Sequence, residues 1–328
     1  MASASTPQRL RRPAVLATGR PGAPRARPSR RRRGGAAWFV APALVLYIGF
    51  LILPMIASVP LSLFDWSGAG PIRSFVGLDN FSRALRDAQF RSAALHNLWL
   101  FVVLFVFTNV VSLGLAILLD RRYALRDLYR AIIFLPYVFS TIAIGFVWQL
   151  ILSPSIGILN PALEAVGLGG LQHTWLADPK SALWVLIAAF AWQWNALATV
   201  TFLAGLQSVP TELREAARID GAREWQVLRD VTLPALAPAF TTVNVLLLIF
   251  AFRAFELAYV ITGPVGAPGG ATLLMGVDIY SNAFPAGTYG ATSSLSYAMA
   301  QGVLLSITLG ALAFAMLAYL TRRERRVS

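Results

Sequence analysis

The sequence predicts an all-α, polytopic membrane protein with six transmembrane helices. Of its 328 residues, 57% are hydrophobic and 13% are charged, whereas about a quarter of an average soluble domain is charged. Each of six apolar runs reaches or exceeds the ~20 residues that a helix needs to cross the hydrocarbon core. These runs are 38–63, 98–119, 131–152, 182–206, 235–261 and 294–320. Backbone groups in lipid must bond to one another, so each run is expected to be helical.

Prolines in these runs are expected to mark kinks or helix ends, namely Pro42, Pro54, Pro136 and Pro238. Residues 1–37 are rich in Arg, Pro, Ala and Ser, which is typical of a disordered basic tail. The run from Trp38 is too long for a cleaved signal sequence, so we expect it to be retained as the first span. The expected domains are the tail 1–37, a transmembrane domain 38–320 and a short tail 321–328.

Basic residues in the loops predict the orientation of the spans, because cytoplasmic loops are enriched in Lys and Arg. With the N-terminus placed inside, the inner segments hold 22 basic residues and the outer loops hold 5. Both termini and the loop 207–234 are therefore expected to be cytoplasmic. The net charge of +13 lies mainly in the N-terminal tail, which we interpret as an orientation signal near anionic lipid rather than as a nucleic-acid-binding arm.

The side chains that enzymes need are poorly represented. The chain has no cysteine and no phosphate-binding loop of the Gly-x-x-x-x-Gly-Lys-Ser/Thr type, and its only lysine, Lys180, lies in an outer loop. His96 and His173 have no partner at metal-ligand spacing. We therefore expect no catalytic activity and no bound cofactor or metal, and any ATP hydrolysis would belong to another chain.

The loop 207–234 is a charged island between two apolar runs. Pro210 suits a first helical turn, and Leu213, Ala216 and Ala217 then fall at i, i+3 and i+4 on one narrow, small-residue face. Gly221 is expected to end this helix in the left-handed conformation, before a second short helix begins at Ala222. Between membrane spans, two short helices with a small-residue face predict a docking surface.

The residues of this loop resemble those of a known family. Glu215-Ala216-Ala217, then Gly221, then Leu233-Pro234 resemble the cytoplasmic coupling loop of permease subunits of binding-protein-dependent ABC importers. The surrounding residues are similar to the carbohydrate-uptake branch, which includes the maltose, glycerol-phosphate and trehalose permeases. The resemblance implies that an ATPase contacts this loop through Glu215, Ala216, Ala217, Asp220, Gly221, Ala222, Leu233 and Pro234.

The same resemblance implies a multi-pass subunit of a bacterial plasma membrane that forms half of the pathway for a sugar or related polyol. Its partners would be a second permease, two cytoplasmic ATPase subunits that use ATP, and an extracytoplasmic substrate-binding protein, with no nucleic acid. An ion-coupled secondary transporter is the alternative, but it would need mid-membrane carboxylates and usually an inverted repeat. Only Glu256 supports it.

Trp192-Gln193-Trp194-Asn195 lies near the middle of the fourth run, away from the interfaces where tryptophans usually gather. Consecutive helical residues point about 100° apart. Trp192 and Asn195 are therefore expected to face the substrate pathway, and Gln193 or Trp194 to pack against a neighbouring helix; helix packing by the whole cluster stays an alternative. Further pathway candidates are Gln149, Asn244, Glu256, Tyr297 and Gln301. Arg253 and Glu256, three apart, are expected to share a helix face and could form an ion pair.

Overall fold

The computed structural model describes residues 34–121, 124–284 and 294–327, so the greater part of the predicted basic tail lies outside the described residues. The chain divides into two units, Met1–Ile52 and Leu53–Ser328. In the first, helix α1 (Gly34–Tyr47) runs into the π-helical η1 (Ile48–Ile52). Gly34 to Ala37 are helical, although the sequence places them in the tail.

Within its described residues, the second unit consists of helices, their connections and one two-stranded antiparallel sheet, in which Phe64 faces Phe75 and Asp65 faces Ser74. Its first elements are α2 (Leu53–Leu61), β1 (Phe64–Asp65), β2 (Ser74–Phe75), α3 (Asp79–Arg86), α4 (Ala88–Phe107), the π-helical η2 (Thr108–Ser112), α5 (Leu113–Asp120), α6 (Arg126–Val138) and α7 (Thr141–Leu152). The next are α8 (Leu159–Ala165), the 3-10 helix η3 (Gly169–Leu171), α9 (Pro179–Ser208), α10 (Thr211–Ile219), α11 (Glu224–Val227) and the π-helical η4 (Leu228–Thr232). The last are α12 (Leu233–Ala235), α13 (Ala237–Phe252), α14 (Glu256–Thr262), α15 (Met275–Ala283) and α16 (Leu295–Val327).

Four helical stretches among the described residues are long and apolar enough to cross a membrane: Val40–Leu61, Ala88–Asp120, Pro179–Ser208 and Leu295–Arg322. Two bent pairs bring the number to six if each counts as one span: α6 with α7, which meet at 99°, and Glu224–Ala235 with Ala237–Phe252, which meet at 63°. The all-helical, multi-span prediction is confirmed.

Several predicted element bounds were wrong. The second span begins at Ala88 rather than at Leu98, and the run 131–152 is bent between α6 and α7. The run 235–261 is not one helix, because α13 ends at Phe252 and α14 starts at Glu256. Pro238 lies in the first turn of α13, where the missing N–H leaves no helical bond broken. Pro54 instead lies inside the continuous helical stretch Val40–Leu61, directly after the π-helical η1.

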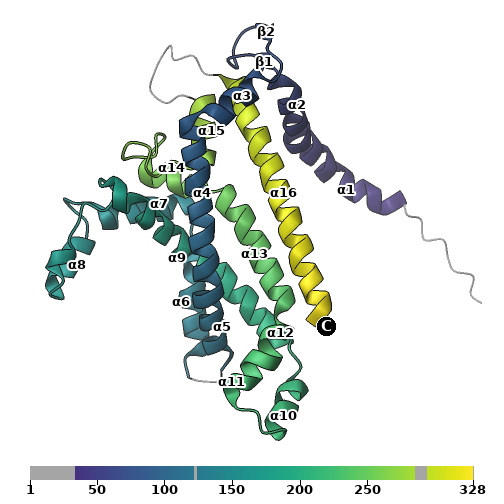
Figure 1. Cartoon of the computed structure of the whole chain (residues 1–328), viewed down its shortest axis with the longest axis vertical. Coiled ribbons are helices and arrows are strands. Elements are labelled where there is room, and N and C mark those ends of the chain that lie inside the picture. Colours follow the sequence, from purple (N-terminus) through teal and green to yellow (C-terminus); the bar gives the residue numbers. More distant parts are fainter. Residues whose placement is uncertain (1–33, 122–123, 285–293, 328) are drawn as a thin grey trace, which may run out of the picture. The chain divides into compact units, whose positions relative to one another are not determined.

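Helix α9 lies against α5, α6, α13 and α4 and contributes the largest share of the core (Figure 1). Its contact with α13 needs a glycine, because a Cβ at Gly205 would lie 2.8 Å from that of Ala239. The same holds between α7 and α14, where a Cβ at Gly145 would lie 2.7 Å from Val260 Cγ1. Such close backbone approach at small residues is typical of packed membrane helices.

Polar side chains join the ends of broken helices to their neighbours. The Nδ2 of Asn97, which is fully buried in α4, donates to the carbonyl of Ala251 in the last turn of α13 at 2.7 Å. Its Oδ1 accepts from the N–H of Met275, the first residue of α15, at 2.8 Å. Helix ends leave these backbone groups without an intrahelical partner. One amide therefore caps two helices.

Two further side-chain amides bond to backbone carbonyls at the ends of helices. Gln149 Nε2 donates to the carbonyls of Val260, at 2.6 Å, and Ile261, at 3.2 Å, which are in the last turn of α14. Asn80 Nδ2 donates to the carbonyls of Ser62, at 2.9 Å, and Phe64, at 3.0 Å, just after α2. Buried polar groups are thus used where the backbone pattern is interrupted.

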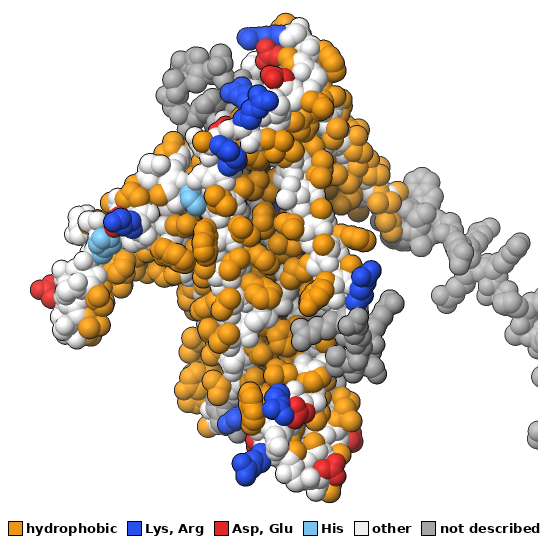
Figure 2. Space-filling model, in the orientation of Figure 1, with side chains coloured by type: hydrophobic (Ala, Val, Ile, Leu, Met, Phe, Trp, Pro, Cys, Tyr) orange, Lys and Arg blue, Asp and Glu red, His pale blue; other side chains and the backbone are white. Residues whose placement is uncertain are grey.

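The segments gather at two ends of the second unit. At one end, Tyr297 Oη donates to Asp87 Oδ2 at 2.7 Å and Gln89 Nε2 donates to Asp278 Oδ1 at 3.0 Å, so that the starts of α4 and α16 meet α15. At the other end, α10 to α12 lie near the end of α5 (Figure 1). Figure 2 shows hydrophobic side chains over the middle and charged ones mainly toward the ends. This pattern fits a membrane-crossing bundle.

We predict that Asn97→Leu lowers the stability of the folded protein. The replacement removes both caps and leaves a buried carbonyl and a buried N–H unpaired, each costing about 1–3 kcal/mol. Thermal unfolding of the purified protein in detergent should show a clearly lower midpoint than wild type. Ser306→Ala, which removes an exposed hydroxyl bonded within its own helix, is the control and should leave the midpoint unchanged. Equal midpoints for both variants would contradict the capping role.

Candidate functional site

The predicted docking surface consists of α10 and α11 and the turn between them. Gly221 has φ +84°, so it adopts the left-handed conformation that the sequence predicts. The N–H of Ala222 bonds to the carbonyl of Ala217, and that of Gly221 to the carbonyl of Arg218, both at 3.0 Å. These two bonds form a Schellman motif, which satisfies carbonyls at the end of α10.

An ion pair spans this turn. Arg218 donates from Nε to Glu224 Oε1 at 2.8 Å and from a terminal nitrogen to Oε2 at 3.2 Å. The hydrogen bonds and charge of Arg218 hold the pKa of the Glu224 carboxyl below its usual value. This preference for the carboxylate is present at neutral pH and is lost as the pH falls through the lowered pKa. The two helices are thus held together on the solvent side.

A second arginine ties α10 to the spans. Arg214 lies 3.2 Å from Asp120 at the end of α5 and donates at 2.6 Å to the carbonyl of Leu206, in the last turn of α9. The Arg214 and Asp120 side chains are only 20% and 24% exposed, so water screens this pair less than the pair in the turn. The position of α10 is therefore set by two spans at once.

The outer face of the loop exposes apolar side chains among charged ones. Ile219 is 86% exposed, Trp225 63% and Leu213 52%. Glu215 and Ala216 are exposed, and Ala217 is half-buried. Figure 2 shows the charged side chains of this end with hydrophobic ones between them. An exposed cluster of this kind is typical of an interaction surface.

The remaining predicted loop residues lie on the path back into the membrane. Asp220 is exposed at the end of α10, and Ala222 is half-buried in the turn. Leu233 and Pro234 begin α12 and are half-buried. They lie just before the 63° bend that separates the loop helices from α13. The loop therefore consists of short helices, with a turn at Gly221 and a 63° bend after α12.

The Trp192–Asn195 cluster faces several directions on α9. Trp192 is 45% exposed and packs edge-on against Trp148 of α7, with ring centres 6.0 Å apart. Asn195 is half-buried, and its Oδ1 accepts from Ser112 Oγ of η2 at 2.7 Å. Gln193 Nε2 donates to Thr141 Oγ1 of α7 at 2.9 Å. Trp194 is buried and stacks against Phe250 of α13, with ring centres 4.6 Å apart.

The other predicted pathway amides and the tyrosine lie at helix joints. Asn244 is buried and exchanges two hydrogen bonds with Asn109, of 2.7 and 3.1 Å, between α13 and η2. Gln301 is buried and donates to Asp278 Oδ2 at 2.9 Å. Tyr297 is buried and donates a hydrogen bond to Asp87, and Gln149 caps α14 as described above. The structure does not bring these residues together with Trp192 in one cavity.

The expectation that Arg253 and Glu256 share a helix face is wrong, and the ion pair considered for them is not formed. Arg253 is the residue at which α13 ends, and Glu256 opens α14, so the two residues do not share a helix face. The ion pairs formed by the described residues do not include this one. Both side chains are exposed on the surface of this chain.

Sequence reasoning missed two polar clusters. Asp278 collects bonds from Gln89 and Gln301, and burial raises the pKa of its carboxyl. His173 Nε2 lies 2.8 Å from Asp178 Oδ2, an ion pair when the imidazole is protonated, which was not expected for a residue without a partner at ligand spacing. No group of three or more His, Asp or Glu side chains suited to a metal is found within the ranges that the structure describes.

The comparison with protein families decides the identity. Residues 109–326 match the model of the binding-protein-dependent transport system inner membrane component. The chain belongs to this family. It is therefore a multi-pass inner-membrane permease of an ABC importer, which is a transport component rather than an enzyme. This family excludes the alternative of an ion-coupled secondary transporter.

Relatives match along most of their length. The chain is 31% identical to the probable starch degradation products transport system permease protein AmyD of Thermoanaerobacterium thermosulfurigenes, over 87% of this chain and 93% of the relative. It is 33% identical to the trehalose/maltose transport system permease protein MalF of Thermococcus litoralis, over 78% and 85%. The lactose transport system permease protein LacF of Rhizobium radiobacter is 31% identical, over 88% and 94%.

A solved structure has the same fold. The crystal structure of a bacterial ABC transporter involved in the import of the acidic polysaccharide alginate contains a chain that aligns with a TM-score of 0.71. The identity is 22%, and the alignment covers 90% of this chain and 97% of the other. At that identity the likeness concerns the fold alone.

We predict that the Arg218–Glu224 pair orders the turn between α10 and α11. Arg218→Glu or Glu224→Arg alone places like charges across Gly221 and should speed amide hydrogen exchange in residues 217–227. The double exchange restores opposite charges and should slow it again. The adjacent pair Arg229–Asp230, with Nε and Oδ1 2.7 Å apart, supplies the control, because exchanging its charges leaves the turn untouched. Fast exchange in the restored double variant would rule out the pair as the ordering contact.

Proposed function

We propose that this chain is the permease subunit of an importer for a sugar or related polyol and forms half of its translocation pathway. The names of its relatives support the substrate class, since they concern starch degradation products, trehalose and maltose, and lactose. Similarity at about one third identity along most of the chain supports a shared class of substrate rather than one shared sugar.

The proposed complex contains a second permease, two cytoplasmic ATPase subunits that hydrolyse ATP, and an extracytoplasmic binding protein that delivers the sugar. The family description includes dependence on a binding protein. A related solved assembly is an alginate ABC transporter in complex with a pentasaccharide-bound periplasmic protein. These findings support the general composition.

The observation that carries the proposal is the surface of α10 and α11. Ile219 and Trp225 are exposed on a short helical hairpin whose turn is closed by Gly221. Removing such side chains from water by contact with a partner is favourable. The proposed contact residues are those named from the sequence, Glu215 to Ala222 with Leu233 and Pro234. The ratio of 22 inner to 5 outer basic residues supports a cytoplasmic position for this surface.

Arg214 suggests how movement of an ATPase would reach the pathway. Because Arg214 joins α10 to Asp120 of α5 and to Leu206 of α9, a push on the hairpin would act on two spans together. Rigid movement of packed helices is a common way to transmit such a change. We propose that this movement opens the pathway alternately to the two sides of the membrane.

Trp192 is the proposed substrate contact of this chain. It is 45% exposed on the central helix α9 beside Trp148, so part of an aromatic ring is available to the apolar C–H groups of a sugar. Asn195 lies one turn further along, with its Oδ1 already held by Ser112, which would fix its Nδ2 for donation. Glu256 is a further proposed pathway residue because it is exposed at the start of α14.

We predict that the conformation of Gly221 is required for ATPase docking. A Cβ at this position would meet nothing within 4 Å, so a substitution acts through the left-handed φ rather than through a clash. Gly221→Val should reduce the amount of ATPase subunit that co-purifies with the permease by about tenfold, because this conformation costs about 1–2 kcal/mol in most residues. Gly221→Asn is the matched control, since asparagine tolerates this conformation.

Full ATPase binding by the Gly221→Val variant would contradict the proposed docking surface. Binding that is lost equally in the valine and asparagine variants would mean that the glycine is needed for contact rather than for conformation.

We predict that Trp192→Ala weakens uptake at limiting sugar. Loss of the aromatic contact, worth about 1.5 kcal/mol at most, corresponds to roughly a tenfold increase in apparent KM. Gln193→Ala is the neighbouring control: it removes the bond to Thr141 and should lower the amount of assembled complex without changing KM. The measurement is uptake of labelled sugar by cells, normalised to the permease present. An unchanged KM for Trp192→Ala would remove this residue from the pathway.

A further inference from the structure

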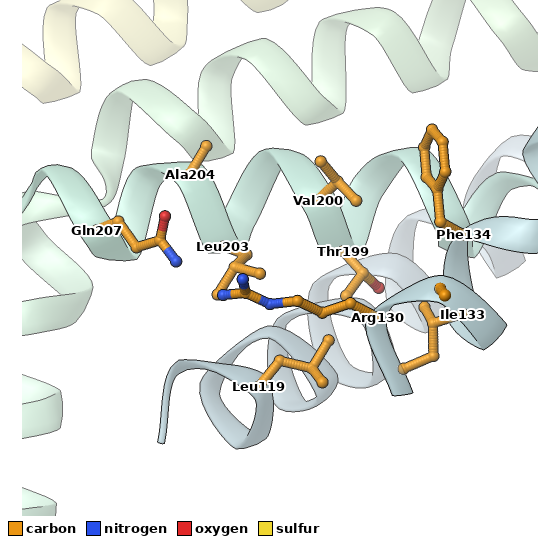
Figure 3. A pocket seen from close by; sticks show the side chains of 10 residues that line it. Leu119, Arg130, Ile133, Phe134, Thr199, Val200, Leu203, Ala204 and Gln207 are labelled. Carbon is orange, nitrogen blue, oxygen red and sulfur yellow. The ribbon is translucent and has the colours of Figure 1, made fainter. Parts of the chain in front are cut away.

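A groove runs along α9 near the end that leads into the hairpin of α10 and α11. It lies between α5, α6 and α9 and has a volume of about 420 Å³ (Figure 3). Its walls are mainly apolar: Leu119, Ile133, Phe134, Val200, Leu203 and Ala204. The described part of this chain leaves the groove unfilled. Walls of this apolar character suit the hydrocarbon chain of a ligand.

One end of the groove is basic. Arg130 lines it and lies along the side of α9, with its guanidinium toward Leu203 and Gln207 in Figure 3. With the Gln207 amide turned to satisfy both arginines, its Oε1 accepts from Arg130 at 2.9 Å and from Arg126 at 3.2 Å. Two cations therefore converge on a single neutral oxygen.

The charge of these arginines is poorly compensated. The Nε atoms of Arg126 and Arg130 are buried and have no hydrogen-bond partner among the described residues. Asp127 lies 3.7 Å from Arg130, but its side chain is 95% exposed, so water screens the pair. Asp120, the other carboxylate at this end of α5, is already engaged by Arg214. An anion with several oxygen acceptors would satisfy this site.

We propose that this groove binds an anionic phospholipid, with its phosphate at Arg126 and Arg130 and an acyl chain between α6 and α9. An apolar slot that ends at paired arginines matches one molecule with both properties. Basic pockets between spans on the cytoplasmic side are suited to such headgroups. The assignment to the cytoplasmic leaflet rests on the orientation proposed above, whereas the binding chemistry does not.

The test measures lipid binding directly. The full chain is purified in detergent with whatever subunits remain bound, stripped of lipid, and titrated with phosphatidylglycerol or phosphatidylethanolamine while bound lipids are counted by native mass spectrometry. Wild type should bind one phosphatidylglycerol per chain about thirty-fold more tightly than the zwitterionic lipid, the effect expected of two basic residues. The double variant Arg126→Gln/Arg130→Gln should lose this preference.

Two further variants separate the headgroup from the chain. Arg322→Gln makes the same change at an exposed arginine near the end of α16 and should keep the preference. Ala204→Trp fills the apolar slot and should weaken binding of both lipids while leaving Arg126 and Arg130 in place. Inorganic phosphate at matched concentration should not displace the bound lipid from wild type.

Three results would overturn the proposal. Equal binding of both lipids by wild type would remove the role of the arginines, and displacement by inorganic phosphate would indicate a soluble anion site. A photoreactive residue at Ala204 that crosslinks to a second permease chain instead of lipid would show that the groove is a subunit interface. Loss of sugar uptake or of ATPase docking with lipid preference intact would count against the proposed function and not against this site.

Discussion

A helix that ends or bends inside a membrane protein leaves backbone carbonyls and N–H groups without partners, and the bilayer offers no water to satisfy them. The architecture of this permease depends on solving that problem. Its bundle contains bends of 99° and 63° and a break between α13 and α14. Asn97 caps α13 and α15, and Gln149 caps α14, in each case from another span. The interruptions of the helices are therefore also the points where the helices are joined.

The hairpin formed by α10 and α11 follows the same principle. Gly221 lets α10 close its own carbonyls through backbone bonds, and Arg214 closes a carbonyl of α9 while it pairs with Asp120 of α5. The hairpin is closed by its own bonds and is attached to two spans. Ile219 and Trp225 are exposed, whereas the Arg214 side chain is only 20% exposed, so the proposed docking of a partner on these exposed side chains would leave the Arg214 contacts in place.

Most of the span pattern could be predicted from the sequence, because apolar runs of sufficient length have few alternatives in lipid. Gly221 was equally predictable, since the left-handed turn is a local property. The break at Arg253 could not be predicted in this way. The residues around it are mostly apolar, so hydropathy alone predicts that Phe252 and Leu257 belong to one helix. The partners of Asn97 and Gln149 lie more than one hundred residues away along the chain. No local pattern specifies such contacts, and a buried amide then resembles a ligand-binding group.

This ambiguity has a physical origin. An amide within an apolar run must find a partner, and a sugar hydroxyl, a broken helix end and another amide satisfy it equally well. Asn244 meets Asn109, and Gln301 meets Asp278 and Asn282, so the hydrogen-bonding capacity of these side chains is largely used within the chain. Trp192 differs, because it is 45% exposed. A pathway that must release its substrate needs weak, incompletely satisfied contacts, whereas a helix joint needs saturated ones. Under the proposed function, saturation of hydrogen bonds, rather than polarity, would separate the residues that hold this bundle together from those that contact the sugar.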